Sequence, residues 1–275
     1  MPELPEVETV RRELEPLVVG ETITRADVHW NRSCAGLNSD GLSAQLSGVR
    51  LRALHRRAKY LLFRGERAGL PQEFSVHLRM TGRLTVREAA APYDPYLRVR
   101  LVFDSGLALH FDDVRKFGRL LVGTPAEVTL PALGPEPFDA SWSGCVWRDR
   151  VRSRLRPIKA LLLDQRLLAG VGNIYADEAL FRAGLSPRRR GVDLTLRECE
   201  ALVAAVREVL SAALAEDGAS FDRFYRTPTG QPGRFQDHFQ VYSRTGKPCY
   251  RCSTPIVRVL VAQRSTHYCP KCQRN

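Results

Sequence analysis

The chain begins with a hydrophobic pattern of helical period. Apolar side chains recur three and four positions apart, which places them on one face of a helix: Leu4, Val7, Val10, Leu14 and Leu17. Pro5 suits the first turn, where its missing N–H is harmless, and Pro16 with Gly20 closes the pattern. We therefore expect a short N-terminal helix with one buried face.

From about Glu21 to Gly123 the hydrophobic pattern changes to a period of two. Three stretches alternate or run apolar, namely residues 49–54, 74–78 and 97–103. The sequence Asp104-Ser105-Gly106 is typical of a hairpin turn. Several short strands separated by turns predict a β-sandwich, and the proline-rich stretch 133–137 predicts its end.

After about Ser141 the pattern becomes helical again. Three segments are helix candidates, namely residues 158–163, 173–183 and 194–215. The segment 217–240 is rich in Gly, Pro, Arg and Phe and predicts a long loop. The chain is therefore expected to be an α+β protein in which strands precede helices.

Composition and charge restrict the class of partner. The chain has 275 residues, enough for two domains, and 44% hydrophobic with 26% charged residues is typical of a globular protein. Forty-two basic against thirty acidic residues give a formal net charge of +12, which favours a polyanionic partner. No apolar run reaches transmembrane length and no signal-peptide pattern is present, so we expect a cytoplasmic protein.

Four cysteines near the C-terminus have the spacing of a metal site. They form two Cys-x2-Cys pairs, Cys249 with Cys252 and Cys269 with Cys272, with sixteen residues between the pairs. Such pairs offer four thiolates to a tetrahedral Zn²⁺. Two disulfides, a redox pair, and a metal site with no role in nucleic-acid binding are the alternatives. Zinc is favoured because nothing in the chain indicates an oxidising compartment.

The residues between the cysteine pairs predict a hairpin. Residues 256–261 read as a strand, 263–266 as the turn and 267–268 as the returning strand. Arg264 is then expected at the tip of a metal-bound hairpin. In so basic a chain, that position indicates a contact with nucleic acid.

The extreme N-terminus contains a candidate nucleophile. Proline at position 2 normally permits removal of Met1, which leaves Pro2 with a secondary amine. An α-amine has a pKa of about 8, so roughly a tenth of it is neutral at pH 7. Attack on a sugar carbon would give a cationic iminium that promotes β-elimination, and Glu3 and Glu6 lie close enough in sequence to move protons. The alternative is that these residues only start a helix.

Motifs along nearly the whole chain resemble those of the bacterial formamidopyrimidine-DNA glycosylases. They are PELPEVET at the N-terminus, RRAKYLL around Lys59, HLRMTG around His77, DDVRKFG around Arg115, LGPEP, GVGNIYADEAL around Asn173 and the terminal CxxC…QRSTHYCPKCQ. The related endonuclease VIII branch typically opens PEGPE and prefers oxidised pyrimidines. Leu4 replaces that glycine here, which favours the purine-lesion branch.

The resemblance implies a fold and a domain division. It implies an N-terminal catalytic β-sandwich flanked by helices (1–137), a helix–two-turns–helix domain with a lesion-capping loop (141–236) and a zinc ribbon (237–275). One structural Zn²⁺ is implied, because four cysteines leave no open coordination position. The implied partner is damaged double-stranded DNA bound by a monomer.

The resemblance also implies site residues. The implied catalytic set is Pro2 as nucleophile, Glu3 as general acid, Glu6, Lys59 and Arg264. The implied DNA-binding set is His77, Met80, Tyr96, Arg115, Phe117, Arg154, Lys159 and Asn173. In this set Met80, Arg115 and Phe117 would fill the space of an extruded base, and Arg115 would pair with the orphaned cytosine.

Without the resemblance, several of these residues have simpler interpretations. Lys59 could lie on a solvated basic edge, and His77 could be an ordinary strand residue. Met80 and Phe117 could pack in a core. Asn173 follows two glycines before a predicted helix that begins at Ile174, which alone indicates a helix cap.

One segment departs from the family pattern. Residues 93–96 read Tyr-Asp-Pro-Tyr where many members have basic or histidine-rich residues. The phosphate contact usually made there could pass to Arg98 or Arg100.

Together, the residues and the resemblance predict a bifunctional glycosylase and abasic-site lyase that removes oxidised purines. It would act on lesions such as 8-oxoguanine and formamidopyrimidines through a Schiff base, followed by β,δ-elimination. The alternatives are an endonuclease VIII-like enzyme for oxidised pyrimidines and a zinc-ribbon protein that binds DNA without catalysis.

Overall fold

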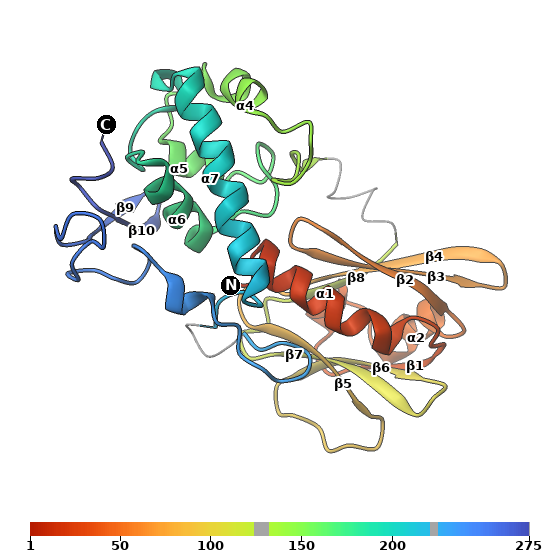
Figure 1. The fold of residues 1–275 in the computed structure, drawn as a ribbon. Coiled ribbons are helices and arrows are strands. Elements are labelled where there is room, and N and C mark those ends of the chain that lie inside the picture. Colours follow the sequence, from red (N-terminus) through yellow and green to blue (C-terminus); the bar gives the residue numbers. More distant parts are fainter. Residues whose placement is uncertain (124–131, 221–224, 275) are drawn as a thin grey trace. The chain divides into compact units, whose positions relative to one another are not determined.

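The computed structural model of the protein describes residues 1–123, 132–220 and 225–274 (Figure 1). The chain divides into two compact units. The first comprises Met1–Pro131 with Asp217–Arg234, and the second Ala132–Glu216 with Phe235–Asn275. Residues 217–234 therefore group with the N-terminal unit, whereas the sequence placed them with the helices. No helix among the described residues is long and apolar enough to cross a membrane.

The first unit is a β-sandwich with a helix along it. Its helices are α1 (Leu4–Val18) and α2 (Ser39–Leu46), with a 3-10 turn, η1 (Asn31–Cys34). Its strands are β1 (Ile23–Val28), β2 (Arg50–Arg57), β3 (Tyr60–Arg67), β4 (Leu70–His77), β5 (Gly82–Glu88), β6 (Leu97–Phe103), β7 (Leu107–Asp113) and β8 (Arg119–Val122). They form two antiparallel sheets, in the orders β1-β6-β7-β5 and β2-β3-β4-β8. The predicted sandwich is confirmed.

Alternating apolar residues of both sheets build the core of this unit. The inward side chains include Phe63, Phe74, Leu101 and Phe111, and α1 adds Val7, Val10 and Leu14. At the end of α1 the buried residue is Val18, whereas Leu17, which the sequence pattern placed on the buried face, is 40% exposed. Gly20 follows with φ +97°, a left-handed conformation that glycine adopts without a steric penalty.

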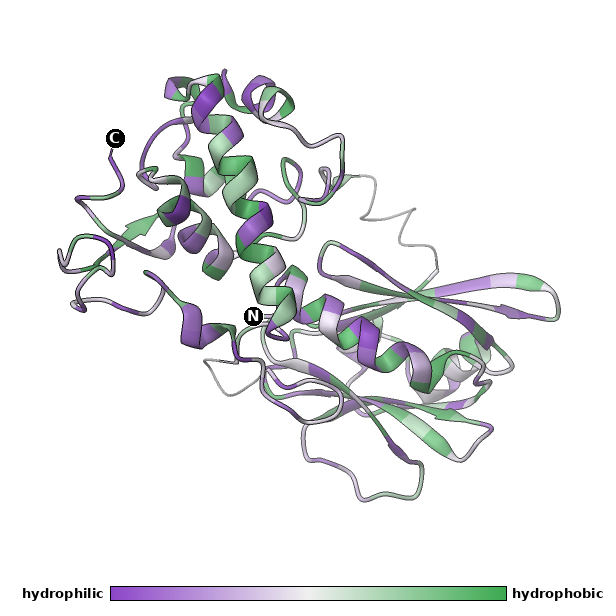
Figure 2. Ribbon diagram, in the orientation of Figure 1, coloured by the Kyte–Doolittle hydropathy of each residue, from purple (hydrophilic) through white to green (hydrophobic). Residues whose placement is uncertain are grey.

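The second unit contains helices and a two-stranded hairpin. Its elements are α4 (Gly144–Val151), α5 (Ile158–Leu162), α6 (Asn173–Ala183), η3 (Gly191–Asp193), α7 (Leu196–Ala215), η4 (Phe235–His238), β9 (Val257–Val261) and β10 (Arg264–Tyr268). Thr195 and Glu198 begin α7 as a capping box. Helix α7 carries hydrophobic and hydrophilic residues along its length (Figure 2). Leu202, Val206 and Leu210 are among its buried residues. The α+β class predicted from the sequence is confirmed.

The hairpin turn differs from the predicted one. Val261 pairs with Arg264, so only Ala262 and Gln263 form the loop. Both residues have positive φ, 47° and 62°, as a type I′ hairpin requires. The prediction of a turn over 263–266 was wrong, because Ala262 and Gln263, which form the loop, are not typical turn residues. Arg264 is consequently the first residue of β10 and is exposed beside the tip.

Candidate active site and nucleic-acid interface

Pro2 and Glu3 lie buried where α1 begins. Glu3 is 2% exposed and Glu6 is 1% exposed. One carboxylate oxygen of Glu6 accepts a hydrogen bond from the Glu3 backbone N–H at 2.8 Å, and the other accepts one from Ala219 N–H at 2.8 Å. Glu6 therefore holds the backbone of Glu3 and fastens the segment after α7 to α1. This geometry favours an anchoring role for Glu6 over the proton shuttle expected from the sequence.

Gly218 makes this anchoring possible. A Cβ atom at this position would lie 2.6 Å from a Glu6 carboxylate oxygen, and its φ of +78° already favours glycine. Tyr225 adds a second attachment to α1, since its hydroxyl lies 3.4 Å from the Glu6 carbonyl, and it also contacts the Asp217 carbonyl at 3.0 Å. The described part of the 217–233 loop is thus held against α1.

Lys59 and His77 lie at neighbouring strand ends. Arg57 pairs with Tyr60, so Ala58 and Lys59 form the two-residue turn between β2 and β3. Tyr60 in turn pairs with His77, and their rings meet edge to face with centroids 4.5 Å apart. Lys59 is 6% exposed, which excludes the solvated basic edge considered from the sequence.

His77 is held as a neutral hydrogen-bond donor. Its Nδ1 accepts the Arg79 backbone N–H at 3.0 Å, so in the neutral ring the proton is on Nε2. Burial lowers the pKa of His77 to about 3, and the cations of Arg79 and Lys59 act in the same direction. A neutral Nε2–H can donate to a phosphate oxygen without a change of protonation between pH 5 and pH 8.

Met80, Arg115 and Phe117 lie on two loops joined by one carboxylate. Buried Asp113 bonds the Thr81 hydroxyl and accepts the backbone N–H of Arg115 at 3.1 Å and of Gly118 at 2.6 Å. Phe117 is 46% exposed, with the Arg115 guanidinium 4.8 Å above its ring, and Met80 is partly exposed. Exposure of Phe117 excludes ordinary core packing, and the pair forms a planar surface suited to stacking.

Tyr96 and Arg154 are exposed. Arg98 and Arg100, which were considered as replacements for the phosphate contact of residues 93–96, are buried. Arg98 donates to the Asp113 carbonyl at 2.8 Å, and Arg100 pairs with Asp27 at 2.6 Å. Arg98 and Arg100 therefore support the sandwich, and their contacts do not favour a phosphate-binding role. Tyr96 is 45% exposed, and among the described residues the Arg154 side chain hydrogen-bonds only to the Arg150 carbonyl.

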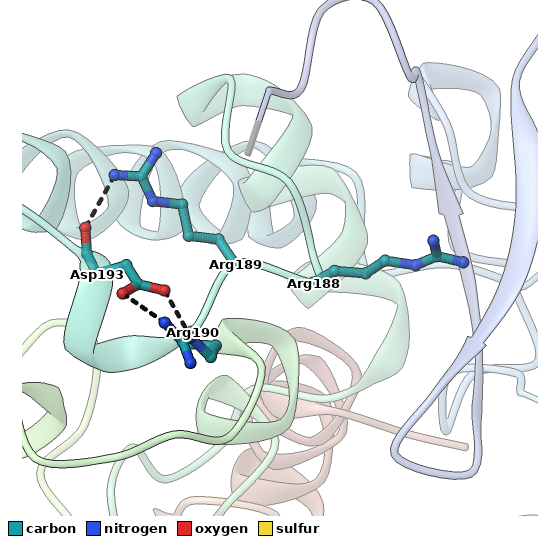
Figure 3. A pocket seen from close by; sticks show the side chains of 4 residues that line it. All are labelled: Arg188, Arg189, Arg190 and Asp193. Atoms are coloured by element: carbon teal, nitrogen blue, oxygen red, sulfur yellow. Dashed lines mark hydrogen bonds and ion pairs between the residues drawn. The ribbon is translucent and has the colours of Figure 1, made fainter.

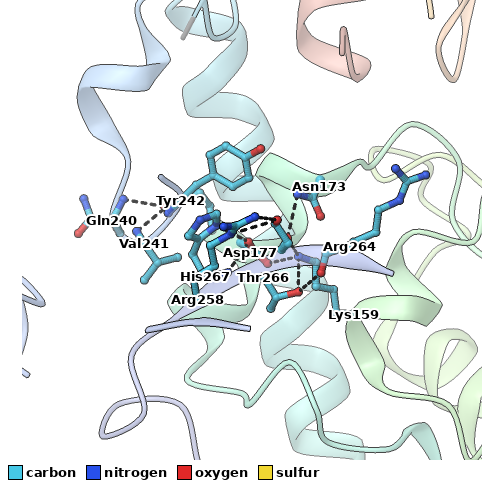
Figure 4. A network of polar contacts seen from close by, with 12 residues as sticks. Lys159, Asn173, Asp177, Gln240, Val241, Tyr242, Arg258, Arg264, Thr266 and His267 are labelled. Carbon is cyan, nitrogen blue, oxygen red and sulfur yellow. Dashed lines mark hydrogen bonds and ion pairs between the residues drawn. The ribbon is translucent and has the colours of Figure 1, made fainter. Parts of the chain in front are cut away.

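In the second unit, Lys159 is buried in a polar network (Figure 4). Its ammonium lies 2.7 Å from the Asp177 carboxylate and donates to the Ser265 carbonyl and the Thr266 hydroxyl, each at 2.8 Å. The other Asp177 oxygen accepts the backbone N–H of His267 at 2.8 Å. Lys159 thus fixes the hairpin onto α5 and α6, and this geometry does not favour the phosphate contact implied by the resemblance.

Asn173 and Arg264 border the same network. The Asn173 amide donates to the Ser265 carbonyl at 3.0 Å, and Arg264 precedes Ser265 with its guanidinium exposed (Figure 4). The helix begins at Asn173, as the 173–183 pattern predicted, and Gly172 is its cap. Asn173 is therefore not the cap that the sequence alone indicated, and its side chain is directed to the hairpin.

Breaking the buried ion pair tests the role of Lys159. We expect Lys159→Met to destabilise the second unit by about 3–5 kcal/mol, because the buried Asp177 carboxylate then loses its ammonium partner. The double variant Lys159→Met/Asp177→Asn should recover part of this loss, since no charge then remains buried. Urea unfolding measures both. Arg182→Met, which breaks the exposed pair with Glu208, is the control and should cost at most about 1 kcal/mol; an equal loss in the control would contradict the prediction.

The four ribbon cysteines come together as predicted. Their sulfur atoms all lie within 4.8 Å of one another, and the Cys249–Cys272 and Cys252–Cys269 pairs are 3.9 and 3.4 Å apart. These separations are close to the edge of a tetrahedron with Zn–S bonds of about 2.3 Å, roughly 3.8 Å. All four thiols are free, which excludes the disulfide alternative in this structure. The cluster fits one structural zinc ion.

Comparisons with known sequences agree along the whole chain. Residues 1–120 match the formamidopyrimidine-DNA glycosylase N-terminal domain, residues 133–224 the H2TH domain of the same enzymes, and residues 246–275 a zinc finger found in FPG and IleRS. A formamidopyrimidine-DNA glycosylase from Chloroflexus aggregans is 48% identical, covering 99% of this chain and 98% of its own. The chain belongs to the formamidopyrimidine-DNA glycosylase family.

Solved structures of the family have the same fold. The MutM (FPG) protein from Thermus thermophilus has a TM-score of 0.88 and 44% identity, covering 99% of this chain and 98% of its own. A complex between Lactococcus lactis Fpg and DNA containing an abasic site has a TM-score of 0.89 and 35% identity, covering 99% of this chain and 100% of its own.

Sequence reasoning missed the supporting residues of this formamidopyrimidine-DNA glycosylase family member. Asp113 and Asp177 occur inside the quoted motifs DDVRKFG and GVGNIYADEAL, but only the structure shows what they bind. Sequence reasoning also missed the burial of His110. Neither of its ring nitrogens has a hydrogen-bond partner among the described residues. The sequence contains a signal for His110. Its neighbours Leu109 and Phe111 face the core, so His110 lies on the outer side of β7, where a sandwich strand usually contacts solvent.

The pH dependence of stability tests the burial of His110 in this family member. Burial lowers the pKa of His110 to about 4, with Arg87 and Arg100 acting in the same direction. The unfolded chain takes up a proton near pH 6.5 and the folded chain does not, so stability falls as pH decreases from about 6.5 toward 4. The free energy of unfolding of the wild type should fall between pH 7.5 and pH 5. We expect this fall to be smaller by roughly 2 kcal/mol in His110→Leu. Urea unfolding at the two pH values measures it; an unchanged loss in the variant would contradict the prediction.

Proposed function

We propose that the protein is a bifunctional DNA glycosylase and abasic-site lyase of base excision repair. It would remove oxidised purines, such as 8-oxoguanine and formamidopyrimidines, from duplex DNA. The observation that carries this proposal is the N-terminus, where Pro2 precedes a buried carboxyl, Glu3, whose backbone is fixed by Glu6. Full-length relatives named formamidopyrimidine-DNA glycosylase support the substrate class.

The proposed chemistry begins at Pro2. Removal of Met1 frees the nitrogen, whose lone pair forms a bond to C1′ of the lesion nucleotide while the glycosidic bond breaks. The base leaves with the electron pair of that bond and takes up the proton that the nitrogen loses. Glu3 donates a proton to the sugar ring oxygen, so the ring opens to a cationic iminium. Loss of a proton from C2′ expels the 3′ phosphate, and a second elimination expels the 5′ phosphate. Lys59 would stabilise the negative charge of a neighbouring phosphate.

Other residues would hold the DNA and replace the extruded base. His77 would donate Nε2–H to a phosphate, and Met80, Arg115 and Phe117 would occupy the space left in the duplex. Inserted apolar and planar groups offset part of the few kcal/mol that unstacking costs. In the second unit Asn173 and Arg264, which share the hairpin backbone, would bind phosphates, with Tyr96 and Arg154 as further contacts.

The remaining expectations are part of the same proposal. Residues 217–233 would cap the flipped base; of these, 221–224 lie outside the described residues. Residues 1–137 would carry the chemistry, with 141–236 and 237–275 binding DNA. The protein would act as a monomer in the bacterial cytoplasm, on the nucleoid.

A second candidate keeps the chemistry and changes the lesion. One solved complex with 34% identity contains Lactococcus lactis FPG bound to DNA with an oxidised pyrimidine. The second candidate is therefore an enzyme that, like endonuclease VIII, prefers oxidised pyrimidines. A zinc-ribbon protein that binds DNA without catalysis is the third possibility, and only covalent chemistry separates it from the other two.

Excision assays on matched duplexes test the proposal. The expected result is faster release of 8-oxoguanine opposite cytosine than of thymine glycol, with a one-nucleotide gap and phosphates at both ends. Faster release of thymine glycol would favour the pyrimidine enzyme. Binding without any release, and without a borohydride-trapped complex, would leave only the non-catalytic protein. Glu3→Gln is a useful partner variant, because it should lower base release more than cleavage of a preformed abasic site, whose sugar already opens to an aldehyde.

A further inference from the structure

An arginine-rich strip runs along two segments of the second unit. Five arginines alternate with other residues through the end of α4 and the segment after it: Arg148, Arg150, Arg152, Arg154 and Arg156. Three more follow the loop after α6: Arg188, Arg189 and Arg190. All except Arg189 are exposed. We call these two segments together the arginine strip.

Backbone hydrogen bonds place the two segments side by side. Val192 N–H donates to the Arg154 carbonyl at 3.0 Å, and Ile158 N–H donates to the Arg189 carbonyl at 2.7 Å. Residues 154–158 therefore adjoin residues 189–192, and Arg148, Arg150 and Arg152 precede this junction in the chain. An open hollow of about 480 Å³ is lined by Arg188, Arg189, Arg190 and Asp193 (Figure 3).

Part of this charge is compensated and part is not. Arg190 makes a two-pronged contact with Asp193, at 2.8 and 3.0 Å, and Arg189 pairs with Glu198 at 3.1 Å. Four arginines have no carboxylate within 4.0 Å in the described part of the chain: Arg148, Arg150, Arg154 and Arg188. The Arg188 side chain extends away from the other two arginines of its segment (Figure 3). These guanidiniums are available to an anionic partner.

The strip begins beside the residues that border the hairpin network. Lys159 follows Ile158 directly and binds the Ser265 carbonyl, which Asn173 also contacts. From Lys159 to Arg154 the chain can extend by at most about 17 Å. That length corresponds to roughly five base steps along a DNA strand. A strip of up to this length can contact more than one phosphate of a DNA strand, whereas a single phosphate would leave most of its guanidiniums unused.

We propose that the arginine strip binds the phosphate backbone of duplex DNA beyond the lesion, on one side of it. This inference rests on the proposed function and extends its DNA contacts from Arg154 to Arg150 and Arg188. Because the contacts are to phosphates, they add affinity without sequence preference and lengthen the bound duplex in one direction only. An acidic protein could also neutralise such a strip, but its place next to Lys159, which shares the Ser265 carbonyl with Asn173, favours DNA.

The test uses the full protein and three duplexes that contain one abasic-site analogue. One is short, about 13 base pairs; the other two are extended to about 25 base pairs on the 5′ or the 3′ side only. The variant is Arg150→Gln/Arg188→Gln. The control is Arg12→Gln/Arg52→Gln, which removes the same net charge from two exposed arginines of the first unit that pair with Glu8 and Glu66. Dissociation constants are measured over a salt series.

The expected result is confined to one extended duplex. There the variant should bind about tenfold more weakly, and its slope of log affinity against log salt should be shallower by about 1.8, as for two lost phosphate contacts. On the short duplex its affinity should change much less. Equal losses on all three duplexes, no loss on any, or the same loss in the control would each overturn the proposal. Binding of polyglutamate that depends on Arg188, without the DNA effect, would assign the strip to an acidic protein instead.

Excision on the short duplex separates this proposal from the proposed function. Wild-type protein that releases no damaged base refutes the enzyme and leaves the binding comparison interpretable. If the wild-type protein excises normally and the variant binds all three duplexes as the wild type does, only the proposal on the arginine strip is refuted.

Discussion

Pro2→Gly is expected to lower the yield of the borohydride-trapped complex on abasic-site DNA by about 100-fold, equivalent to about 2.7 kcal/mol of lost stabilisation. The secondary amine of proline gives an iminium with no N–H, so the cation cannot be lost by deprotonation. Glycine gives a primary amine, whose imine can lose a proton and become a neutral, weaker electron sink. Trapping is measured by the fraction of labelled DNA that becomes covalently attached to protein.

Two controls keep this result interpretable. Pro5→Ala changes another buried proline in the first turn of α1 but leaves the terminal nitrogen in place, so it should trap like the wild type. Binding of the uncleaved abasic analogue should be similar in Pro2→Gly and wild type. Full trapping by Pro2→Gly, or an active wild-type protein that keeps Met1 by mass spectrometry, would refute Pro2 as the nucleophile.

Loss of zinc is expected to have the second large effect. Cys269→Ser, or treatment with a strong chelator, should reduce DNA affinity by about 100-fold or more, because structural zinc supplies most of the folding free energy of such small modules. The cluster around the cysteines is small, comprising Phe181, Val241, Ile256 and the buried Cys249 and Cys269. Without the metal the hairpin should unfold.

Cys145 offers the matched control, since it is exposed on α4 and lies outside the cluster. Cys145→Ser should retain both one equivalent of zinc and wild-type DNA binding. The far-UV signal of the sandwich should persist in Cys269→Ser, because its core contains none of the four ligands. Unchanged DNA affinity in zinc-free protein would show that the ribbon does not contribute to binding.

Local signals explain what the sequence predicted well. The cysteine spacing, the helix over 173–183 and the alternating strand over 97–103 each depend on neighbours in the chain, and the structure has all three. The roles of Lys159 and Glu6 could not be predicted in this way. Their partners, Thr266 and Ala219, lie 107 and 213 residues away, so only the folded chain shows that they are structural anchors.

The hairpin turn shows a different limit. Ala262 and Gln263 have little preference for positive φ, and the register of the paired strands imposes it on them. Likewise, Gly172 rather than Asn173 caps α6, because the Asn173 amide is engaged by Ser265. Tertiary contacts overrode local preference at both positions.

The carboxylate of Asp113 ties Thr81 to the backbone of Arg115 and Gly118. The loop after β4 and the loop after β7 therefore share a single point of attachment and cannot drift apart independently. Insertions or deletions in one loop should be tolerated only when the other changes with it, so efforts to retune opposite-base preference need libraries that vary both loops together.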